Sequence, residues 1–564
     1  EFEVLPPGEP AEQHPLSCLL TVVNGRPVAA TKKDQAEAIF DPLREANWKV
    51  NTITSGKQPV IECSYTLTAA EAKSLGLNAP VEVIKRYSVA EITNPEDQDN
   101  AYAMAYHVDC ELELRNLGTE AQEVSWQLDG PNGLPFEGWW YSNKISPGWG
   151  AAGARDLVWR RHENTRSFRS CPSIYTYAAK NPTKPAESML GTDDATQLDY
   201  VGVDGQYFSA VLIPDVNSDV ERSSFRKAVT KPVYGIENIK KVDYKRTNVS
   251  FQVTSVPHAL AVDGSFKQTM RLFAGPKVPA LMAKYDLDDV IEYGWFKMVS
   301  IPLSSLLHFL RHYVVFNYAL AIIALTVIVR GCMYPFSRQA AKNAQIMQEI
   351  SPEIKKIAEK YKNDLQKRSD AQSELFKKYN YHPLSGCLPM FLQLPIFLGL
   401  YRSLAVDIEL RQAALIPGIE WCSNLAGPDM LFFWKPYLPE FLGGEAAGWL
   451  GPYFNLLPLI SVALLQVHQR LFTPPATDEQ TKMTQDMMKY TTLFMGVLFF
   501  KVPAGLCIYF ITSSLWSVCE RVFLPKVKAP VPGAPVPEKT SFFAKKPSTN
   551  GEEKAKPTKK QRKR

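Results

Sequence analysis

An arginine interrupts the most apolar part of this chain. Residues 313–329 are apolar or nearly so, and Arg330 follows before the run ends at Tyr334. Placing an arginine at the centre of a membrane helix costs about 2.5–3.5 kcal/mol, whereas one leucine or phenylalanine returns only about 0.3–0.6 kcal/mol. Such a side chain either extends to the membrane surface as an anchor or acts as a working charge within the membrane. Position alone leaves both readings open.

Further polar side chains stand within the apolar runs. They are Thr326, Gln393, Gln466, Ser513 and Ser514. Each of them singly is more often an interhelical hydrogen bond than a functional group. Together, in so few helices, they predict a shared polar cavity that opens toward the cytoplasm. A cation in such a low-dielectric recess attracts a carboxylate more strongly than a cation in bulk water.

Signatures of catalysis and metal binding are missing from the sequence. The stretch at residues 55–58 lacks the spacing and hydroxyl of a phosphate-binding loop, and neither HExxH nor GxSxG occurs. His162 and Glu163 have no second histidine at a suitable distance. We therefore predict that the protein is not an enzyme and has neither a cofactor nor a metal site.

The cysteines form no CxxC pair. A disulfide among Cys18, Cys63, Cys110 and Cys171 would be compatible with export of the first half of the chain, and buried free thiols are the alternative.

Long apolar runs predict the helices that must position these side chains. We place membrane spans at about 313–334, 385–406, 452–472, 488–502 and 504–524. Residues 286–312 form a linker and an amphipathic helix, which we expect to lie in the membrane interface or to pack as a core helix of the preceding domain. Residues 336–379 predict two short amphipathic helices packed as a hairpin, with Ile350 and Ile354 on the apolar face of the first.

The first half of the chain has the pattern of β-structure. Segments 103–116, 207–215 and 248–256 alternate or run apolar over strand-like lengths between turn residues. Asp263-Gly264 predicts a type I′ hairpin turn, and short helices are expected at 34–48 and 69–76. Residues 1–285 are therefore predicted to form one large, mostly antiparallel sandwich.

Charge predicts the orientation in the membrane. Residues 335–379 carry ten Lys/Arg and six acids, a net of +4, whereas residues 407–451 carry two and six, a net of −4. The tail from residue 526 carries twelve Lys/Arg and three acids, a net of +9. The positive-inside rule then puts the first loop and the tail in the cytoplasm and residues 1–312 outside. Since that requires export, we expect a signal or a further span before residue 1.

Several motifs together resemble one family. TVIVRGCMYPFSRQAAKNAQIMQEISPEIKKI, HPLSGCLPMFLQLPIFLGLYRSL, DIELRQA and FFKVPAGLCIYFITSSLW occur in the order and spacing of the YidC/Oxa/Alb membrane-protein insertases, over about 290–524. The large first half, ending in FAGPK and followed by YGW, resembles the Gram-negative-type members. The resemblance implies a multi-domain chain: an all-β periplasmic super-sandwich (1–285), then an α-helical membrane bundle of five conserved transmembrane helices (313–524) with a cytoplasmic helical hairpin, and a basic disordered tail (525–564).

The resemblance also implies a function. Family members insert nascent proteins into the bacterial inner membrane, alone or with the Sec translocon, through a hydrophilic groove whose central charge falls here on Arg330. Thr326 and Tyr509 match groove-lining positions. Expected partners are nascent membrane proteins, the Sec translocon, and the ribosome or anionic lipids. The tail positions expected to contact ribosomal RNA or lipid are Lys554, Lys556, Lys559, Lys560, Arg562, Lys563 and Arg564.

Some positions depart from the family pattern. Phe510 stands where a second tyrosine is frequent, and Ser514 replaces a common asparagine. Lys501 and Arg402 are additional charges near the outer ends of their spans. A small-solute transporter using the same cavity is the alternative function, although the internal repeats typical of transporters are not found. The sandwich resembles sugar-binding folds, but residues 1–285 offer no convincing acid/base pair.

Overall fold

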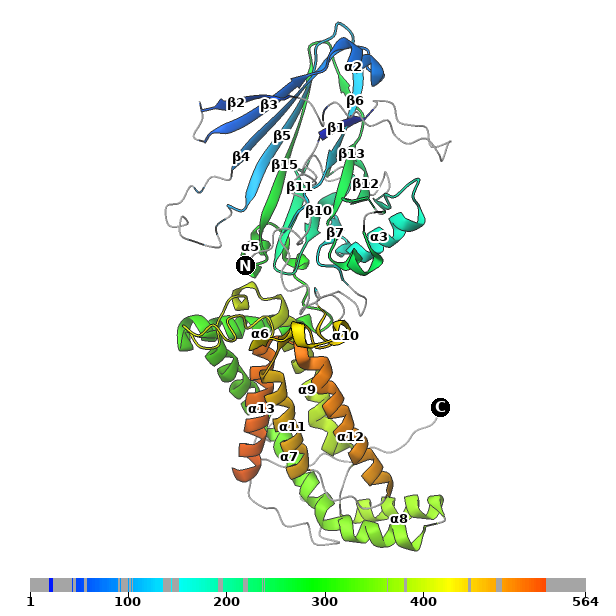
Figure 1. The fold of residues 1–564 in the computed structure, drawn as a ribbon, viewed down its shortest axis with the longest axis vertical. Coiled ribbons are helices and arrows are strands. Elements are labelled where there is room, and N and C mark those ends of the chain that lie inside the picture. The colour runs from blue at the N-terminus through cyan, green and yellow to red at the C-terminus, as the bar shows by residue number, and fades with distance from the viewer. Residues whose placement is uncertain are drawn as a thin grey trace, which may run out of the picture.

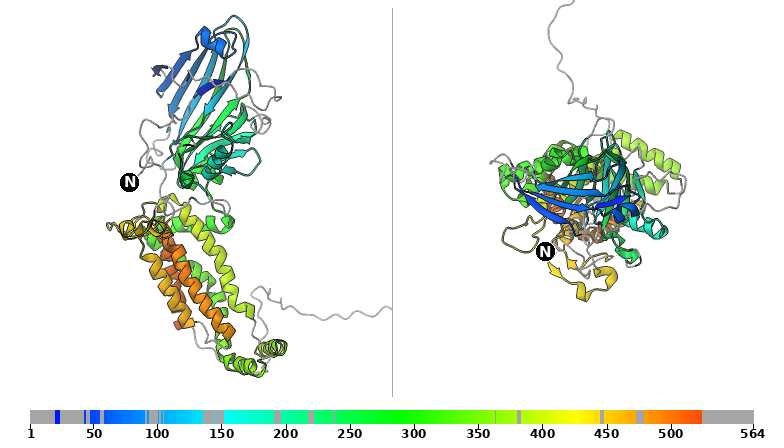
Figure 2. Two further views of the ribbon diagram at one scale, coloured as in Figure 1. Left: turned by 45° about the vertical axis from the view of Figure 1, so that its right-hand side comes forward. Right: turned by 90° about the horizontal axis from the view of Figure 1, so that it is seen from above.

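The chain folds into a part built of strands followed by a part built of helices, and the strands stand at one end of the helices (Figures 1 and 2). The computed structural model describes residues 20–23, 43, 47–54, 58–89, 92, 100, 103, 105–134, 144, 152–190, 196–216, 222–235, 237, 239–362, 364–379, 383–444, 448–472 and 479–523. The predicted order of a sheet-rich region and a helical region is confirmed. The basic tail, Cys18 and most of the helix expected at 34–48 lie outside the described residues.

Two antiparallel sheets form the first part. The larger follows the order β2-β3-β4-β5-β15-β11-β10-β7-β8, and the smaller follows β1-β6-β13-β12-β9, with β14 also beside β6. The larger contains Lys49–Ile53, Val60–Thr66, Val81–Val89, His107–Asn116, Ser265–Pro276, Phe208–Pro214, Leu198–Asp204, Asp156–Arg161 and Ser167–Arg169 in that order. The smaller contains Leu20–Val23, Gln122–Asp129, Val249–Ser255, Phe225–Pro232 and Ser188–Leu190, and β14 is His258–Leu260.

The two sheets pack face to face around a common core. Trp126 and Phe251 from the smaller sheet meet Leu114 and Leu212 from the larger, and all four are almost fully buried. Alternate residues of one strand serve different cores: Leu212 of β11 points into the sandwich, and Val211 points to the opposite face of its sheet. This period of two is the one expected of strands, so the predicted sandwich is present.

The Asp-Gly turn has a different role from the one predicted. Asp263 has φ 52° and Gly264 N donates to Ala261 O at 3.0 Å, so a tight turn forms. However, only Asp263 of the pair adopts positive φ, and β14 before the turn pairs with β6 whereas β15 after it pairs with β5. The turn therefore carries the chain from one sheet to the other, and the type I′ hairpin is wrong.

Short helices and small strands complete the connections. They are α2 (Ala69–Ser74), α3 (Cys171–Lys180), η4 (Lys241–Lys245), α5 (Pro279–Lys284), η5 (Asp288–Val290), η7 (Ile408–Leu410), β16 (Phe432–Phe433), η8 (Lys435–Tyr437), α10 (Glu440–Gly443), β17 (Tyr453–Phe454) and η9 (Phe499–Lys501). α2 lies within the helix expected at 69–76, and its Thr68 and Glu71 form a reciprocal capping box.

Disulfides do not join the cysteines of the sandwich that the structure describes. Cys63 and Cys110 are free and lie on β3 and β5, on opposite sides of β4. Two strand spacings put them about 10 Å apart, beyond the reach of a disulfide. Cys171 is free and fully buried at the start of α3.

Among the described residues, seven longer helices build the second part. They are α6 (Lys297–Leu310), α7 (Tyr318–Lys360), α8 (Leu365–Lys378), α9 (Pro383–Val406), α11 (Leu457–Phe472), α12 (Glu479–Leu498) and α13 (Ala504–Phe523). A π-helical turn, Arg311–Val315, separates α6 from α7. Phe316 then turns into the left-handed region, and Asn317 caps α7 by accepting from Leu320 N at 3.1 Å. The first apolar helix therefore begins at Tyr318, five residues later than the predicted span.

One helix in the described part of the chain, α7, is both long and apolar enough to cross a membrane. Two shorter apolar stretches, Phe391–Val406 and Ala504–Glu520, are too short to pass the same criterion. α11 and α12 carry charged residues such as Arg470 and Lys489, which lowers their mean hydropathy. The five spans remain a prediction.

α6 exposes large apolar side chains and buries small polar ones. Met298 and Phe309 are more than half exposed, as is Trp295 just before the helix, whereas Ser300 and Ser304 are buried. A side chain at Gly399 of α9 would approach Val299 to 3.1 Å, so the two helices are in close contact there. The two serines therefore face the protein and not the solvent. The outward apolar face suits the predicted position at a lipid surface.

The predicted hairpin is built from α8 and the second half of α7. Ile350, Ile354 and Leu375 form its core, and the Tyr379 hydroxyl donates to Glu353 at 2.7 Å. Its first helix is not separate, because α7 runs on for 43 residues through Pro335 and Pro352. The hairpin lies at the end of the helices farthest from the sandwich (Figure 1).

A shared apolar cluster joins the two parts. It combines the outer face of the larger sheet, including Val211, with Leu281 of α5 and with Ala405 and Val406 at the end of α9. The guanidinium of Arg411 lies 5.4 Å from the centre of the Phe208 ring. The sandwich is therefore fixed to the helices by packing as well as by the chain.

A buried charge cluster holds the end of β10. Asp204 pairs with Asp156 across the sheet, and Lys144 Nζ lies 2.8 Å from Asp204 and 3.1 Å from Asp156. Lys277 Nζ lies 3.0 Å from Asp204 on its other side. Burial alone would raise the pKa of Asp204, but the two ammonium groups outweigh it and lower that pKa. Asp204 is therefore held ionised between two ammonium groups, whereas burial raises the pKa of its neighbour Asp156.

Replacing Asp204 with asparagine should destabilise the sandwich strongly. D204N leaves two buried ammonium groups with one carboxylate, and breaking a buried pair costs about 3–5 kcal/mol. Denaturant unfolding of the full protein in detergent, followed by tryptophan fluorescence, measures the change. The control is D263N on the exposed turn, where asparagine also accepts positive φ and the change should stay within about 0.5 kcal/mol. Equal stability of the two variants would show that the cluster is not stabilising.

Candidate functional site

A cavity of about 440 Å³ lies among the helices. Its lining comes from α7, α9, α11, α12 and α13 and from the segment that joins the last two. Five of the predicted site residues line it: Arg330, Gln393, Tyr509, Ser513 and Ser514. The structure thus brings together side chains that are up to 184 residues apart in the sequence.

Arg330 is held in this cavity by a hydroxyl. Its Nε donates to Ser513 Oγ at 2.7 Å, and its Nη2 donates to the same oxygen. The side chain is half-buried. Within the part of the chain that the structure describes, no carboxylate lies within 4 Å of the guanidinium. The remaining N–H groups of the cation are therefore available to an acceptor that enters the cavity.

Tyr509 and Gln393 form a second polar pair. Tyr509 is 1% exposed, and its hydroxyl accepts a hydrogen bond from Gln393 Nε2. The amide oxygen of Gln393 is buried and has no hydrogen-bond partner among the described residues. Because an unsatisfied buried acceptor costs about 1–3 kcal/mol, this oxygen is suited to accept from water or from a bound polypeptide.

Helical spacing explains why one face of α13 is polar. Tyr509, Ser513 and Ser517 follow one another at intervals of four and line the cavity together with Ser514. Ser517 Oγ donates to Ser513 O at 3.0 Å, so it also satisfies the helix backbone. Residues four apart lie one above the other on a helix, which brings these hydroxyls next to Arg330.

Thr326 and Gln466 lie outside the cavity lining. Thr326 is 1% exposed and its hydroxyl donates to Ile322 O of its own helix at 2.7 Å. Although Thr326 lies about one turn before Arg330 on α7, its side chain does not face the cavity. Gln466 Nε2 donates instead to Lys489 O at 3.2 Å and links α11 to α12.

Sequence reasoning missed several polar lining residues. They are Ser461, His468, Gln469, Thr492 and Ser517. Gln469 Nε2 donates to Thr492 Oγ1 at 2.7 Å, which is a second link between α11 and α12. The signal was present as spacing: Ser461, Leu465, His468 and Gln469 recur at three and four residues, which places them on one face of α11.

The rest of the lining is apolar. It includes Leu394, Phe397, Val462, Leu465, Met495 and Phe499. Leu394 is 52% exposed, so this side of the cavity reaches the outer surface of the helices. Phe510, at a position that departs from the family pattern, packs its ring 5.3 Å from that of Phe397. The cavity therefore combines one polar side with one apolar side.

Lys501 lies away from the polar side of the cavity. Its ammonium donates to Gly448 O at 2.9 Å, in the segment that contains the small β16–β17 sheet. That contact ties the segment to the start of α13.

A group of possible metal ligands lies near the sandwich. His308, His312 and Glu409 place one ligand atom each within 4.8 Å of one another. The sequence analysis predicted no metal site. It missed this group because His308 of α6 and His312 of the following π-helical turn meet a glutamate that is distant in the sequence. Histidines at i and i+4 were the available signal.

Two family models match the chain. One, described as 60Kd inner membrane protein, matches residues 309–530, and the other, described as YidC periplasmic domain, matches residues 166–306. The first spans the cavity and the hairpin, and the second spans much of the sandwich and α6. The two matches meet where the strands give way to the helices.

Similar proteins carry the name YidC, which also appears in the description of the second model. The protein of Rickettsia canadensis (strain McKiel) named "Membrane protein insertase YidC" is 28% identical over 349 residues, which are 59% of this chain and 56% of that protein. The one of Pelobacter propionicus is 31% identical over 295 residues, 51% of each chain. This chain thus spans about half the length of the curated relatives it matches.

A solved structure shows only a loose likeness. A crystal structure of an active YidC insertase with its first transmembrane domain resolved covers 86% of this chain and 97% of its own, at 16% identity and a TM-score of 0.32. The family assignment rests on the sequence matches, which lie in both parts of the fold. The chain belongs to the YidC family of inner-membrane proteins, among the members that carry a periplasmic domain.

Proposed function

We propose that the protein inserts nascent proteins into the bacterial inner membrane. The observation that carries the proposal is the guanidinium of Arg330, which is bound to the Ser513 hydroxyl and has no carboxylate within 4 Å among the described residues. A cavity with one cation, several hydroxyls and an apolar side suits a polypeptide that has an acidic tail and a hydrophobic segment. The relatives named as insertases support the same function.

The proposed mechanism uses attraction and release. An acidic tail entering from the cytoplasm is attracted to Arg330, and its backbone N–H groups bond to Gln393 and the cavity hydroxyls. Its hydrophobic segment meanwhile leaves along the apolar side into the lipid. An inside-negative membrane potential favours the outward movement of each negative charge by about 2.3 kcal/mol per 100 mV. Insertion therefore needs no nucleotide.

The proposal includes an orientation and partners. The sandwich is periplasmic, and the hairpin of α7 and α8 and the basic tail are cytoplasmic, as the charge of residues 335–379 and 526–564 favours. The hairpin and tail contact the ribosome or anionic lipids, and larger substrates are shared with the Sec translocon.

Removing the cavity charge should impair insertion. Charge-assisted hydrogen bonds contribute about 1.5–3 kcal/mol, so R330A should lower the insertion rate roughly 10–100-fold, whereas R330K should retain most of it. The measurement uses the full-length protein in liposomes and a small single-span substrate with an acidic outer tail. A substrate whose acids are replaced by amides is the control and should lose the dependence on Arg330.

Two results would count against this function. If R330A inserts the acidic substrate as fast as wild type, then Arg330 is a membrane anchor only. If the liposomes show solute flux through the wild-type protein but no insertion, then the cavity serves a transporter.

Pairing Arg330 with a carboxylate from the protein itself should also block insertion. S513D places a carboxylate where Arg330 already finds its hydroxyl partner, so an internal ion pair competes with the substrate tail. S513N has the same size without the charge and is the matched control. We expect S513D to lower the insertion rate roughly tenfold or more and S513N to stay within about threefold. Equal rates for the two variants would mean that the free charge of the guanidinium is not used.

A further inference from the structure

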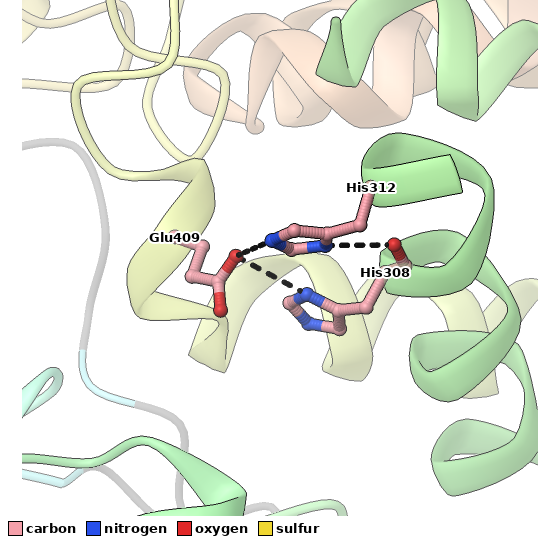
Figure 3. A group of neighbouring side chains, drawn as sticks. All are labelled: His308, His312 and Glu409. Carbon is pink, nitrogen blue, oxygen red and sulfur yellow. Dashed lines mark hydrogen bonds and ion pairs between the residues drawn. The ribbon is translucent and has the colours of Figure 1, made fainter. Parts of the chain in front are cut away.

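Two histidines and a glutamate converge between α6 and the segment that follows α9. His308 lies in the last turn of α6, and His312 lies four residues later in the π-helical turn, so both imidazoles project to one side (Figure 3). Glu409 reaches them from η7, directly after α9. Glu409 Oε2 lies 3.4 Å from His308 Nδ1 and 3.9 Å from His312 Nε2.

The far nitrogen of each imidazole already faces an oxygen atom. His308 Nε2 lies 2.9 Å from Asp407 Oδ2, and His312 Nδ1 lies 2.9 Å from the backbone oxygen of His308. In the neutral tautomers that carry their hydrogen on these far nitrogens, the lone pairs lie on His308 Nδ1 and His312 Nε2, which both face Glu409. Histidines that bind metals are held in this way, with the second nitrogen donating to a carboxylate or a carbonyl.

We propose that His308 Nδ1, His312 Nε2 and Glu409 Oε2 bind a zinc ion. Two imidazole nitrogens and one carboxylate oxygen form a common three-ligand set for Zn²⁺, with water as the fourth ligand. The atoms already lie within 4.8 Å of one another, and ligands on a tetrahedral ion with bonds of about 2.0–2.1 Å lie about 3.4 Å apart. Only a small closure is required, and the set is distinct from the cavity that contains Arg330.

The surroundings of the three atoms suit a bound cation. The Tyr318 hydroxyl hydrogen-bonds Glu409 and lies 3.2 Å from His308 Nδ1, so it stands beside the metal position and can bond to the ligand water. The His312 side chain is half-exposed, which gives the ion a path of entry. The Arg311 guanidinium packs over the Tyr318 ring, 5.3 Å from its centre, and is the nearby positive charge.

Without a metal, Asp407 and Glu409 favour the protonated form of His308. Burial alone would lower the pKa of His308, but the hydrogen bonds and charges of Asp407 and Glu409 outweigh it and raise that pKa to about 10. Zinc must displace this proton, so binding releases it and weakens as the pH falls.

A bound ion would connect two segments that come from different parts of the sequence. α6 precedes the bundle, and η7 follows the end of α9, whose Ala405 and Val406 pack against the sandwich. Zinc at this point would hold α6 in place relative to the contact between the sandwich and the helices.

Zinc binding to the full-length protein, purified in detergent without a polyhistidine tag, tests the proposal. A chromophoric chelator competes for Zn²⁺, and the dissociation constant is measured for wild type, H312Q and E409Q. Each variant lacks one of three ligands and should bind at least roughly 100-fold more weakly, and D407N should bind about 10–100-fold more weakly because it loses the carboxylate that orients His308. Magnesium should not compete, because it prefers oxygen ligands.

A matched histidine separates this site from adventitious binding. His162 Nδ1 lies 3.5 Å from Asp199 Oδ1, which is also an imidazole beside a carboxylate, but it belongs to no described group of three possible ligands. H162Q should bind zinc as tightly as wild type. X-ray absorption of the wild-type complex should show two imidazoles and further oxygen ligands at about 2.0 Å.

Three outcomes overturn the proposal. They are a wild-type affinity no tighter than that of H312Q, an affinity that H162Q weakens as much as H312Q does, and an absorption spectrum without imidazole ligands. Since His312 is half-exposed, H312Q should fold normally, and circular dichroism confirms this before the affinities are compared.

Discussion

A guanidinium among apolar helices must find hydrogen-bond acceptors, and this requirement organises the helical part of the molecule. An unpaired charge in apolar surroundings costs several kcal/mol. Arg330 meets the requirement with Ser513, which stands on a polar face of α13, and that face must point inward. Tyr509 on the same face then meets Gln393 of α9. The helices cannot close completely over these groups, and a cavity remains.

Packing at the other end fixes the sandwich to the helices. Four neighbouring strands of the larger sheet, β15, β11, β10 and β7, are apolar on both faces: one face covers the core of the sandwich, and the other contacts α5, η5 and the end of α9. Strands with both faces covered read as nearly continuous apolar runs, as in Phe208–Pro214. Because α9 contributes to this contact and also to the cavity, the two parts share one structural element.

Local patterns predicted much of this fold, and long-range contacts account for what they missed. The apolar run of Phe208–Pro214 and the alternation along Val249–Ser255 indicated strands, and helical spacing in residues 346–357 indicated the hairpin. The turn at Asp263 was found, but its flanking strands join different sheets, and no local signal says which partner a strand takes. Spacing within one helix likewise indicated polar faces without saying which face meets the cavity.

The candidate site was likewise predicted in part from local patterns, and the rest depends on long-range contacts. Arg330, Gln393, Ser513 and Ser514 were chosen because polar groups in apolar runs are costly, and that criterion is independent of tertiary contacts. Tyr509 was predicted only from the resemblance to the family. Thr326 satisfies the criterion but bonds to its own helix backbone, which a sequence does not reveal. Glu409 is 97 residues from His312 along the chain, so their proximity depends on the packing of α6 against α9.

The continuity of α7 has a mechanical consequence. Its 43 residues extend about 65 Å, roughly twice the hydrocarbon thickness of a bilayer. Arg330 lies about one third of the way along the helix, and the hairpin lies at its far end. Pro335 has no N–H to offer the carbonyl of Gly331, so that turn of α7 bends more easily than the turns without a proline. Bending at Pro335 would displace the hairpin over a large distance. The segment of α7 before Pro335, in which Arg330 is bonded to Ser513, would keep its position.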